Sequence, residues 1–220
     1  MRTRIKMCGT TRIEDALAAV NLGVDALGFI FVEKSPRNIT PAVAQSIISS
    51  LPSFVGRVGV FVDSGMDEIK LIVERCGLTQ LQLHGNESVS FCSQLRRWNK
   101  SLSICKAFRV GADSPSVDTA SYGPAIDSIL LDTYIKGIKG GTGDSFDWRL
   151  IHTLDIERPL ILAGGLAPAN ISEALVKVSP FAVDINSGVE DAPGIKNHQK
   201  LSELVALVGD YDFHRRQECV

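Results

Sequence analysis

The sequence predicts an α/β fold in which one parallel eight-stranded sheet closes into a single (β/α)8 barrel. Short apolar, β-branched stretches alternate eight times with stretches of helical periodicity. The first predicted strand runs into Cys8-Gly9-Thr10-Thr11, which is not the G-x-G-x-x-G of an open dinucleotide-binding sheet. The chain has 220 residues, close to the lower size limit of about 200 residues for a TIM barrel.

The predicted strands are short, and several are apolar on both alternating faces, which is typical of strands covered on both sides. In chain order they comprise residues 4–8, 26–32, 57–62, 80–84, 102–108, 128–132, 160–163 and 182–185.

The predicted helices show apolar residues at positions i, i+3, i+4 and i+7. This spacing is clearest over residues 13–20, 69–76, 171–178 and 201–208, and weakest after the fifth and sixth strands. Thr11 and Glu14 have the spacing of a capping box, and Thr40-Pro41 places an N-cap before a proline. Gly77 is a candidate C-terminal cap. We expect the barrel to occupy residues 1–209, followed by a C-terminal tail over 210–220.

Composition excludes several classes of protein. Hydrophobic residues make up 45% and charged residues 22%, with a net charge of −2, so the chain should be neither disordered nor a nucleic-acid binder. No apolar run is long enough to span a membrane, and the N-terminus lacks the apolar stretch of a signal peptide. We therefore expect no membrane partner.

The cysteines and histidines argue against disulfides and metals. The five cysteines are an odd number without C-x-x-C spacing, which favours a reducing, cytoplasmic location. The four histidines make no H-x-x-x-H pair, so a protein-bound metal site is not expected. Three cysteines are expected to be buried core residues and one to be an exposed tail residue: Cys76, Cys92, Cys105 and Cys219 respectively.

The active site of such a barrel lies at the C-terminal ends of its strands. These ends carry a thiol, an imidazole and carboxylates, and the loop after the second strand adds a guanidinium: Cys8, His84, Asp63, Asp132, Asp184 and Arg37. The seventh strand ends in Gly164-Gly165 and the eighth is followed by Asn186-Ser187-Gly188. Barrels often bind phosphate with these two loops, because glycine lets backbone N–H groups approach an anion.

The motifs resemble those of the phosphoribosylanthranilate isomerase family over nearly the whole chain. The matching segments, in order, are Lys6-Met7-Cys8-Gly9-Thr10-Thr11, Gly28-Phe29-Ile30-Phe31 with Ser35-Pro36-Arg37, Gln82-Leu83-His84-Gly85, Leu130-Leu131-Asp132-Thr133, Gly140-Gly141-Thr142-Gly143, Gly164-Gly165-Leu166 and Asp184-x-x-Ser187-Gly188-Val189-Glu190. Asn186 stands where the family commonly has serine, and Asn197 where it commonly has aspartate.

The resemblance implies an Amadori rearrangement in tryptophan biosynthesis, without metal or redox cofactor. N-(5-phosphoribosyl)anthranilate would become 1-(2-carboxyphenylamino)-1-deoxyribulose 5-phosphate. By resemblance, Asp132 is the general acid, Cys8 the general base and Arg37 the partner of the anthranilate carboxylate. Asp184 would contact the sugar hydroxyls or position the anilino nitrogen, His84 would line the substrate pocket, and Gly140-Gly141-Thr142-Gly143 would cover it. Lys6 shares the face of Cys8 but lies about 7 Å along the strand, so we expect no direct help from it.

Three alternatives stay open beside this interpretation. Another phosphosugar isomerase, such as the histidine-pathway enzyme, usually uses two aspartates, whereas the first strand here ends in cysteine. A flavin-dependent barrel oxidoreductase would be yellow, and a non-catalytic phosphate-binding barrel would bind product without turnover. The expected partner is the small phosphosugar-anthranilate substrate, and the chain is expected to be a monomer or a homodimer.

Overall fold

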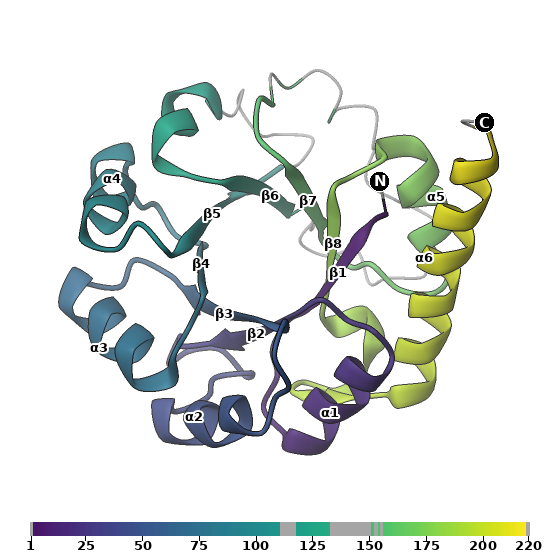
Figure 1. The fold of residues 1–220 in the computed structure, drawn as a ribbon, viewed down its shortest axis with the longest axis horizontal. Helices are drawn as coiled ribbons and strands as arrows, with labels where there is room; N and C mark the ends of the chain where they lie inside the picture. Colours follow the sequence, from purple (N-terminus) through teal and green to yellow (C-terminus); the bar gives the residue numbers. More distant parts are fainter. Residues whose placement is uncertain (1, 111–117, 133–150, 152–153, 155, 219–220) are drawn as a thin grey trace.

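The computed structural model describes residues 2–110, 118–132, 151, 154 and 156–218. Eight parallel strands, β1 to β8, pair in chain order, and β8 pairs with β1 to close the barrel. Figure 1 looks along the barrel and shows the helices arranged around the outside of the strands. The predicted (β/α)8 fold is therefore confirmed.

All eight predicted strands are present; β6, β7 and β8 have the predicted bounds, and the ends of the others move by one or two residues. They are β1 Arg4–Met7, β2 Ala26–Ile30, β3 Gly56–Phe61, β4 Gln80–Leu83, β5 Ser103–Arg109, β6 Ser128–Asp132, β7 Leu160–Ala163 and β8 Ala182–Ile185. Cys8 and His84 lie one residue beyond their strands. Their N–H groups still donate to the carbonyls of Ile185 and Phe61, each at 2.8 Å, so the sheet fixes their backbones.

The described residues contain six α-helices: α1 Ile13–Asn21, α2 Pro41–Ser49, α3 Met66–Cys76, α4 Val89–Trp98, α5 Ile171–Val178 and α6 His198–Glu218. Between β5 and β6 the described segment holds a 3-10 helix, Ala120–Ala125, in the place where a full helix was expected. Most of the connection between β6 and β7, including Gly140 to Gly143, lies outside the described residues. None of the helices within the described ranges is both long and apolar enough to cross a membrane.

Two of the three predicted helix caps are confirmed. The Thr40 hydroxyl accepts from the N–H of Val43 at 3.4 Å, and Gly77 ends α3 in the left-handed conformation. The capping box at Thr11 is wrong, because α1 begins one residue later without a side-chain cap. The Thr11 hydroxyl instead donates to the carbonyl of Gly194 at 2.5 Å. The Thr11 hydroxyl therefore makes a tertiary contact instead of capping the helix, and local sequence spacing does not reveal such a contact.

Most predicted apolar helix faces pack on the barrel. The four spaced residues of α3 and of α5 are all buried. In α1, by contrast, Ile13 and Leu17 are 37% and 38% exposed, while Ala16 and Ala19 are fully buried. Small side chains therefore form the contact at this helix.

The described cysteines carry free thiols. Cys76, Cys92 and Cys105 are buried, as expected of core residues, and Cys8 is buried as well. Cys219, expected to be exposed, lies outside the described residues.

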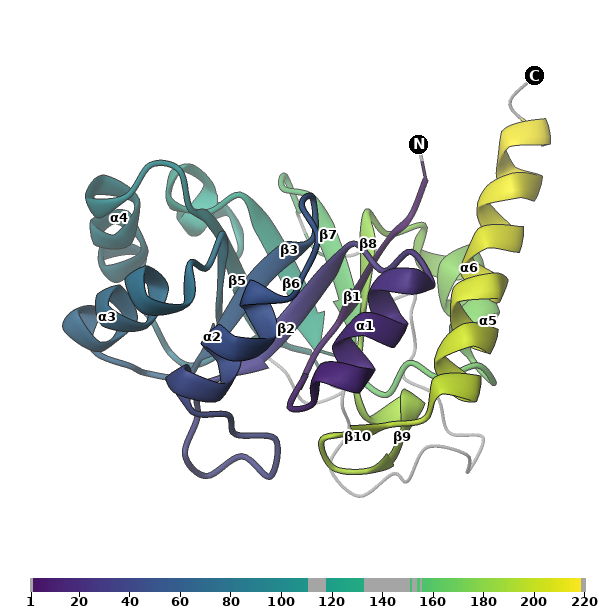
Figure 2. The same cartoon turned by 60° about the horizontal axis from the view of Figure 1, so that its bottom comes forward.

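The last helix continues through residues 210–218, which the sequence predicts as a tail. Asp212 in α6 is buried and accepts the Thr3 N–H at 2.7 Å and the Thr3 hydroxyl at 2.9 Å. Figure 2 shows α6 beside α1 and α5, with both chain termini at the same end of the barrel. The end of α6 therefore fastens the start of β1.

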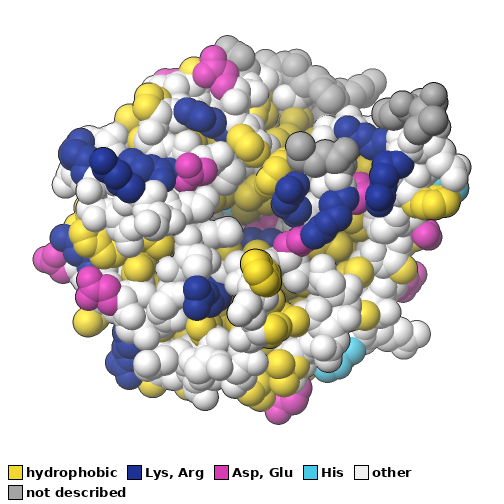
Figure 3. Space-filling view, in the orientation of Figure 1, with side chains coloured by type: hydrophobic (Ala, Val, Ile, Leu, Met, Phe, Trp, Pro, Cys, Tyr) yellow, Lys and Arg dark blue, Asp and Glu magenta, His cyan; other side chains and the backbone are white. Residues whose placement is uncertain are grey.

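The amino ends of the strands form a face of mixed character. Figure 3 looks onto it and shows basic, acidic and hydrophobic side chains interspersed. Arg2 pairs with Asp25 here, and the Arg4 guanidinium lies 4.4 Å from the centre of the Phe181 ring. These contacts hold the start of β1 at the end of the barrel opposite to the strand ends that carry the predicted site.

We expect Asp212→Ala to lower the free energy of unfolding by about 1–3 kcal/mol, because it leaves the buried Thr3 N–H without an acceptor. Urea denaturation followed by circular dichroism would measure the loss. Asp210→Ala is the matched control, because Asp210 is an exposed acid on the same helix. Equal shifts in both variants would show that the contact with Thr3 contributes nothing specific.

Candidate active site

A cavity of about 500 Å³ opens at the C-terminal ends of the strands. Nine of the ten predicted site residues line it: Cys8, Arg37, His84, Asp132, Gly164, Gly165, Asp184, Asn186 and Ser187. Gly188 is not part of the lining and lies against Leu166 and Ala167 in the loop after β7. Gln82 and three apolar residues, Ile30, Val60 and Ala163, complete the wall. Asp63 is not in the lining either, and its carboxylate accepts the Asn86 N–H at 2.6 Å.

Lys6 makes direct contact with the thiol of Cys8, contrary to expectation. A Cβ placed on Gly28 would lie 2.9 Å from Cys8 Sγ and 3.1 Å from Lys6 Nζ, so both atoms lie beside this glycine, and the Lys6 ammonium hydrogen-bonds to the thiol. Lys6 Nζ also donates to Asp184 Oδ2 at 2.7 Å, across the β1–β8 pairing. The expectation considered only the backbone spacing between Lys6 and Cys8, whereas the four-carbon side chain of lysine is long enough to bridge that distance.

Burial and charge act in opposite directions on this trio. Burial raises the pKa of the Cys8 thiol, and the positive charge of Lys6 offsets only part of that rise. Burial alone would lower the pKa of Lys6, but Asp184 and Cys8 outweigh it and raise that pKa. Lys6 is therefore a permanent ammonium beside a thiol that is mostly protonated at neutral pH.

Only one of the two carboxylate oxygens of Asp184 has a hydrogen-bond partner among the described residues. Its Oδ2 accepts from Lys6, while its Oδ1 is buried and has no partner within the described part of the chain. A buried acceptor without a donor costs about 1–3 kcal/mol. Asp184 also lines the cavity.

His84 connects Asp132 to the barrel interior. Its Nε2 lies 3.3 Å from Asp132 Oδ2, and its Nδ1 lies 3.1 Å from the amide nitrogen of Gln82. With that amide donating to Nδ1, the neutral ring carries its proton on Nε2 and directs it at Asp132. Gln82 is buried and was not predicted, although it shares a strand face with His84.

A buried ion pair fixes the segment around His84. Lys106 Nζ donates to the carbonyls of Leu83 and Gly85, at 3.2 and 2.8 Å, on either side of the histidine. It also pairs with Glu87 Oε2 at 3.1 Å, and both side chains are almost completely buried. The backbone that carries the His84 imidazole is therefore held in place at the end of β4.

The two glycine-bearing turns lie against each other. Gly164 and Gly165 both have positive φ, of 99° and 63°, which suits glycine at the end of β7. A Cβ on Gly188 would lie only 2.0 Å from the carbonyl oxygen of Leu166, so the turn after β8 can approach this loop only with glycine there. The turns thus form one continuous wall of backbone.

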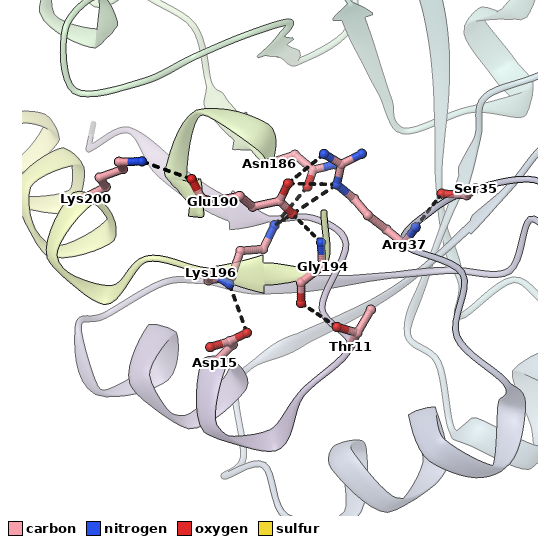
Figure 4. Close-up of polar contacts among 9 residues, drawn as sticks. All are labelled: Thr11, Asp15, Ser35, Arg37, Asn186, Glu190, Gly194, Lys196 and Lys200. Carbon is pink, nitrogen blue, oxygen red and sulfur yellow. Dashed lines mark hydrogen bonds and ion pairs between the residues drawn. The ribbon is translucent and has the colours of Figure 1, made fainter. Parts of the chain in front are cut away.

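Arg37 is held by a residue that the sequence prediction left without a role. Its Nε lies 3.0 Å from both carboxylate oxygens of Glu190, and its Nη2 lies 2.6 Å from Oε2 (Figure 4). Glu190 begins a two-stranded hairpin after β8, formed by β9 Glu190–Ala192 and β10 Ile195–Lys196. The family motif contains Glu190, but local spacing gives no sign of a partner 153 residues away.

The candidate groups follow one another around the barrel. Asp132 ends β6, the two turns follow β7 and β8, Cys8 follows β1, and Arg37 lies in the loop after β2. A phosphate bound by the turns would therefore have a carboxyl on one side and a thiol on the other. No group of three or more His, Cys, Asp or Glu residues suited to a metal ion occurs among the described residues.

Comparison with known proteins gives one consistent family. The model of the family described as N-(5'phosphoribosyl)anthranilate (PRA) isomerase matches residues 5–206. The chain is 45% identical over 205 residues to N-(5'-phosphoribosyl)anthranilate isomerase of Pseudomonas fluorescens, covering 93% of this chain and 98% of that protein. It is 46% identical over 209 residues to the enzyme of the same name from Nitrosospira multiformis, covering 95% and 98%.

Solved structures agree with the sequence comparisons. The phosphoribosyl anthranilate isomerase of Thermus thermophilus has a TM-score of 0.82 at 38% identity and covers 94% of this chain and 99% of its own. A phosphoribosyl anthranilate isomerase in complex with reduced 1-(o-carboxyphenylamino)-1-deoxyribulose 5-phosphate has a TM-score of 0.77 at 35% identity, with the same coverage. Monomers generated from the dimeric enzyme of Thermotoga maritima give 0.76 at 36%, covering 94% and 98%. The chain therefore belongs to the N-(5'-phosphoribosyl)anthranilate isomerase family.

Proposed function

We propose that this chain is an isomerase that converts N-(5-phosphoribosyl)anthranilate to 1-(2-carboxyphenylamino)-1-deoxyribulose 5-phosphate, a step of tryptophan biosynthesis. The observation that carries the proposal is the placement of Asp132 and Cys8 on either side of the β7 and β8 turns, around one cavity. An Amadori rearrangement needs one acid and one base that flank a phosphosugar, and this site offers both.

Asp132 is the acid in the first step. Its carboxyl group protonates the ring oxygen of the furanose, and the bond between C1 and that oxygen breaks. The ring opens to a protonated Schiff base between C1 and the anilino nitrogen. His84, at 3.3 Å, then donates to the carboxylate that remains on Asp132.

Cys8 is the base in the second step. Its thiolate removes the proton from C2, and the electron pair of the C–H bond forms the C1–C2 double bond of an enolamine. That intermediate tautomerises to the ketone. Asp132 has lost one proton and Cys8 has gained one, so a single proton returned from the thiol to the carboxylate resets the site.

The remaining residues bind the substrate. The end-on edge of the Arg37 guanidinium, which is formed by its two terminal nitrogens Nη1 and Nη2, suits the planar anthranilate carboxylate. Asp184, which lines the cavity, accepts from a sugar hydroxyl or from the anilino nitrogen. The turns at Gly164-Gly165 and Asn186-Ser187 receive the phosphate with backbone N–H groups.

The direct test supplies anthranilate, phosphoribosyl pyrophosphate and the transferase that joins them, and then follows the fluorescence of phosphoribosylanthranilate. Its fluorescence should decay in proportion to added enzyme. Binding of the product without turnover would identify a phosphate-binding barrel instead. Turnover of only the histidine-pathway aminoaldose would identify the sister isomerase.

Lys6→Met should slow alkylation of Cys8 by iodoacetamide at pH 8 by roughly threefold to tenfold, with recovery at higher pH. Burial already raises the pKa of Cys8, and loss of the lysine charge raises it further, so less thiolate is present at a given pH. Peptide mass spectrometry separates Cys8 from the other buried thiols. Lys100→Met, at an exposed lysine, is the control. Unchanged alkylation in Lys6→Met would show that the charge of Lys6 does not promote ionisation of Cys8.

The partner and location stay predictions. The small phosphosugar-anthranilate substrate is the proposed partner, and sedimentation would separate the monomer from a homodimer such as that named for the Thermotoga maritima enzyme. The four described cysteines are free thiols, which suits the proposed reducing, cytoplasmic location.

A further inference from the structure

Glu190 lies behind Arg37, which lines the cavity, and its carboxylate accepts several hydrogen bonds. Besides Arg37, its oxygens accept the N–H of Gly194 at 3.1 Å and Lys196 Nζ at 2.8 Å. Figure 4 shows these donors converging on the one side chain. Only 4% of the Glu190 side chain is exposed, so solvent does not compete for these bonds.

The anchors of Glu190 do not depend on Arg37. Lys196 is completely buried, and its backbone N–H donates to Asp15 of α1 at 3.1 Å. The carbonyl of Glu190 accepts from Lys200 of α6 at 3.0 Å. The carboxylate is therefore fixed by the hairpin and two helices, whereas Arg37 reaches it on a long side chain from a loop.

Charge balance keeps Glu190 ionised. Burial alone would raise its pKa, but the hydrogen bonds from Arg37 and Lys196 outweigh this and hold the pKa below its usual value. Glu190 is thus one carboxylate shared by two cations, Arg37 and Lys196.

The contact with Glu190 occupies one edge of the Arg37 guanidinium and leaves a second edge for a ligand. Glu190 takes Nε and one N–H of Nη2, which is the side-on edge. The end-on edge, formed by Nη1 and the second N–H of Nη2, can hold a second carboxylate. Arg37 lines the cavity, so a ligand there can meet this edge.

The stem of Arg37 is confined as well. A Cβ on Gly9 would lie 2.7 Å from Arg37 Cδ and 2.8 Å from Asn186 Oδ1, so these side chains close around the glycine next to Cys8. Lys196 Nζ also donates to that Asn186 oxygen at 2.8 Å. The same buried ammonium thus joins the Arg37 support to the turn after β8.

We infer that Glu190 is the positioning residue for Arg37: it holds the side-on edge so that the end-on edge faces the substrate carboxylate. This inference rests on the proposed function. It separates the recognition of the carboxylate, which needs Glu190, from the binding of the sugar phosphate, which does not.

The test compares the affinity for two ligands that differ only in the carboxylate. They are reduced 1-(o-carboxyphenylamino)-1-deoxyribulose 5-phosphate and the same compound made from aniline, each titrated by isothermal calorimetry. Wild type should prefer the carboxylate-bearing ligand by about tenfold or more, as expected of a charge-assisted bidentate contact. Arg37→Met and Glu190→Gln should both abolish most of this preference, and the affinity for the aniline ligand should change by less than about twofold.

The double variant Arg37→Met/Glu190→Gln should lose no more preference than Arg37→Met alone, because both changes remove the same contact. Asp191→Asn is the matched control, an exposed acid in the same hairpin. If Glu190→Gln does not fold, Glu190→Asp keeps the charge beside Lys196 and withdraws the carboxylate from Arg37 by one methylene. It should lose the preference too.

The outcomes distinguish the inference about Glu190 from the proposed role of Arg37. If Arg37→Met loses the preference and the Glu190 variants keep it, the inference is overturned and the role of Arg37 stands. If the Glu190 variants weaken both ligands equally, Glu190 only supports the hairpin, and the inference is again overturned. If Arg37→Met keeps the preference, the proposed carboxylate contact itself is wrong.

Discussion

Asp132→Asn is expected to lower kcat by roughly 10²–10⁴-fold, the usual contribution of a general acid. An amide keeps the shape of the carboxyl group and can still face His84, but it has no acidic proton to give to the ring oxygen. Steady-state fluorescence assays with phosphoribosylanthranilate would measure the loss. Binding of the reduced product analogue should stay within a few-fold of wild type, since the anthranilate carboxylate and the phosphate are proposed to be bound by Arg37 and the two turns.

The control for this variant is Asp63→Asn. Asp63 also follows a strand of the barrel, but it bonds to the loop at Asn86 and does not line the cavity. Its replacement should leave kcat within about twofold of wild type. Full activity in Asp132→Asn would assign the acid to another group, and His84 would be the next to replace.

Cys8→Ala is expected to have an effect of similar size, roughly 10²–10⁴-fold on kcat, because it removes the base that takes the C2 proton. Cys8→Ser should not restore activity, because a hydroxyl is far less acidic than a thiol and supplies almost no anion. Cys105→Ala is the matched control, a buried cysteine packed in the barrel interior with Ala107, Leu130 and Ala163. Near-normal turnover in Cys8→Ser would reject the thiolate as base.

The same residue sets the pH dependence. The thiolate is the active form, and burial raises the pKa of the thiol, so kcat/KM should rise with pH through the neutral range and into the alkaline range. Lys6→Met should move this rise to higher pH. A profile that falls over the same range would show that ionisation of Cys8 does not limit the reaction.

The barrel could be predicted from the sequence because its strands and helices alternate regularly. The position of the cavity then follows from the barrel. Alternation of strands and helices fixes the architecture, and a residue that follows a parallel strand must lie at the C-terminal mouth. This is why Cys8, Asp132 and the turns at Gly164 and Ser187 line one cavity. The first and fourth strands end one residue before the predicted end, although the N–H groups of Cys8 and His84 still make the next ladder bond.

Contacts over long sequence distances could not be predicted in this way. Thr11 binds Gly194 instead of capping its helix, and Glu190 meets Arg37 across 153 residues. The contact of Lys6 with Cys8 was missed for a different reason, since backbone spacing along the strand ignores the length of the side chain. Each of these contacts depends on where a side chain ends, which periodicity does not specify.

The cavity lies across the seam of the barrel, where the last strand closes on the first. Its acid comes from β6, its turns from β7 and β8, its base from β1 and its guanidinium from the loop after β2, so both ends of the chain supply the site. The pairing of Arg4 with Ala182 joins residues far apart in sequence, and contacts of this kind form slowly in folding. Recovery of activity during refolding should therefore report ring closure itself and lag behind helix formation. Half-barrels produced as separate polypeptides, β1–β4 and β5–β8, should stay inactive until they associate at both junctions, β4 with β5 and β8 with β1.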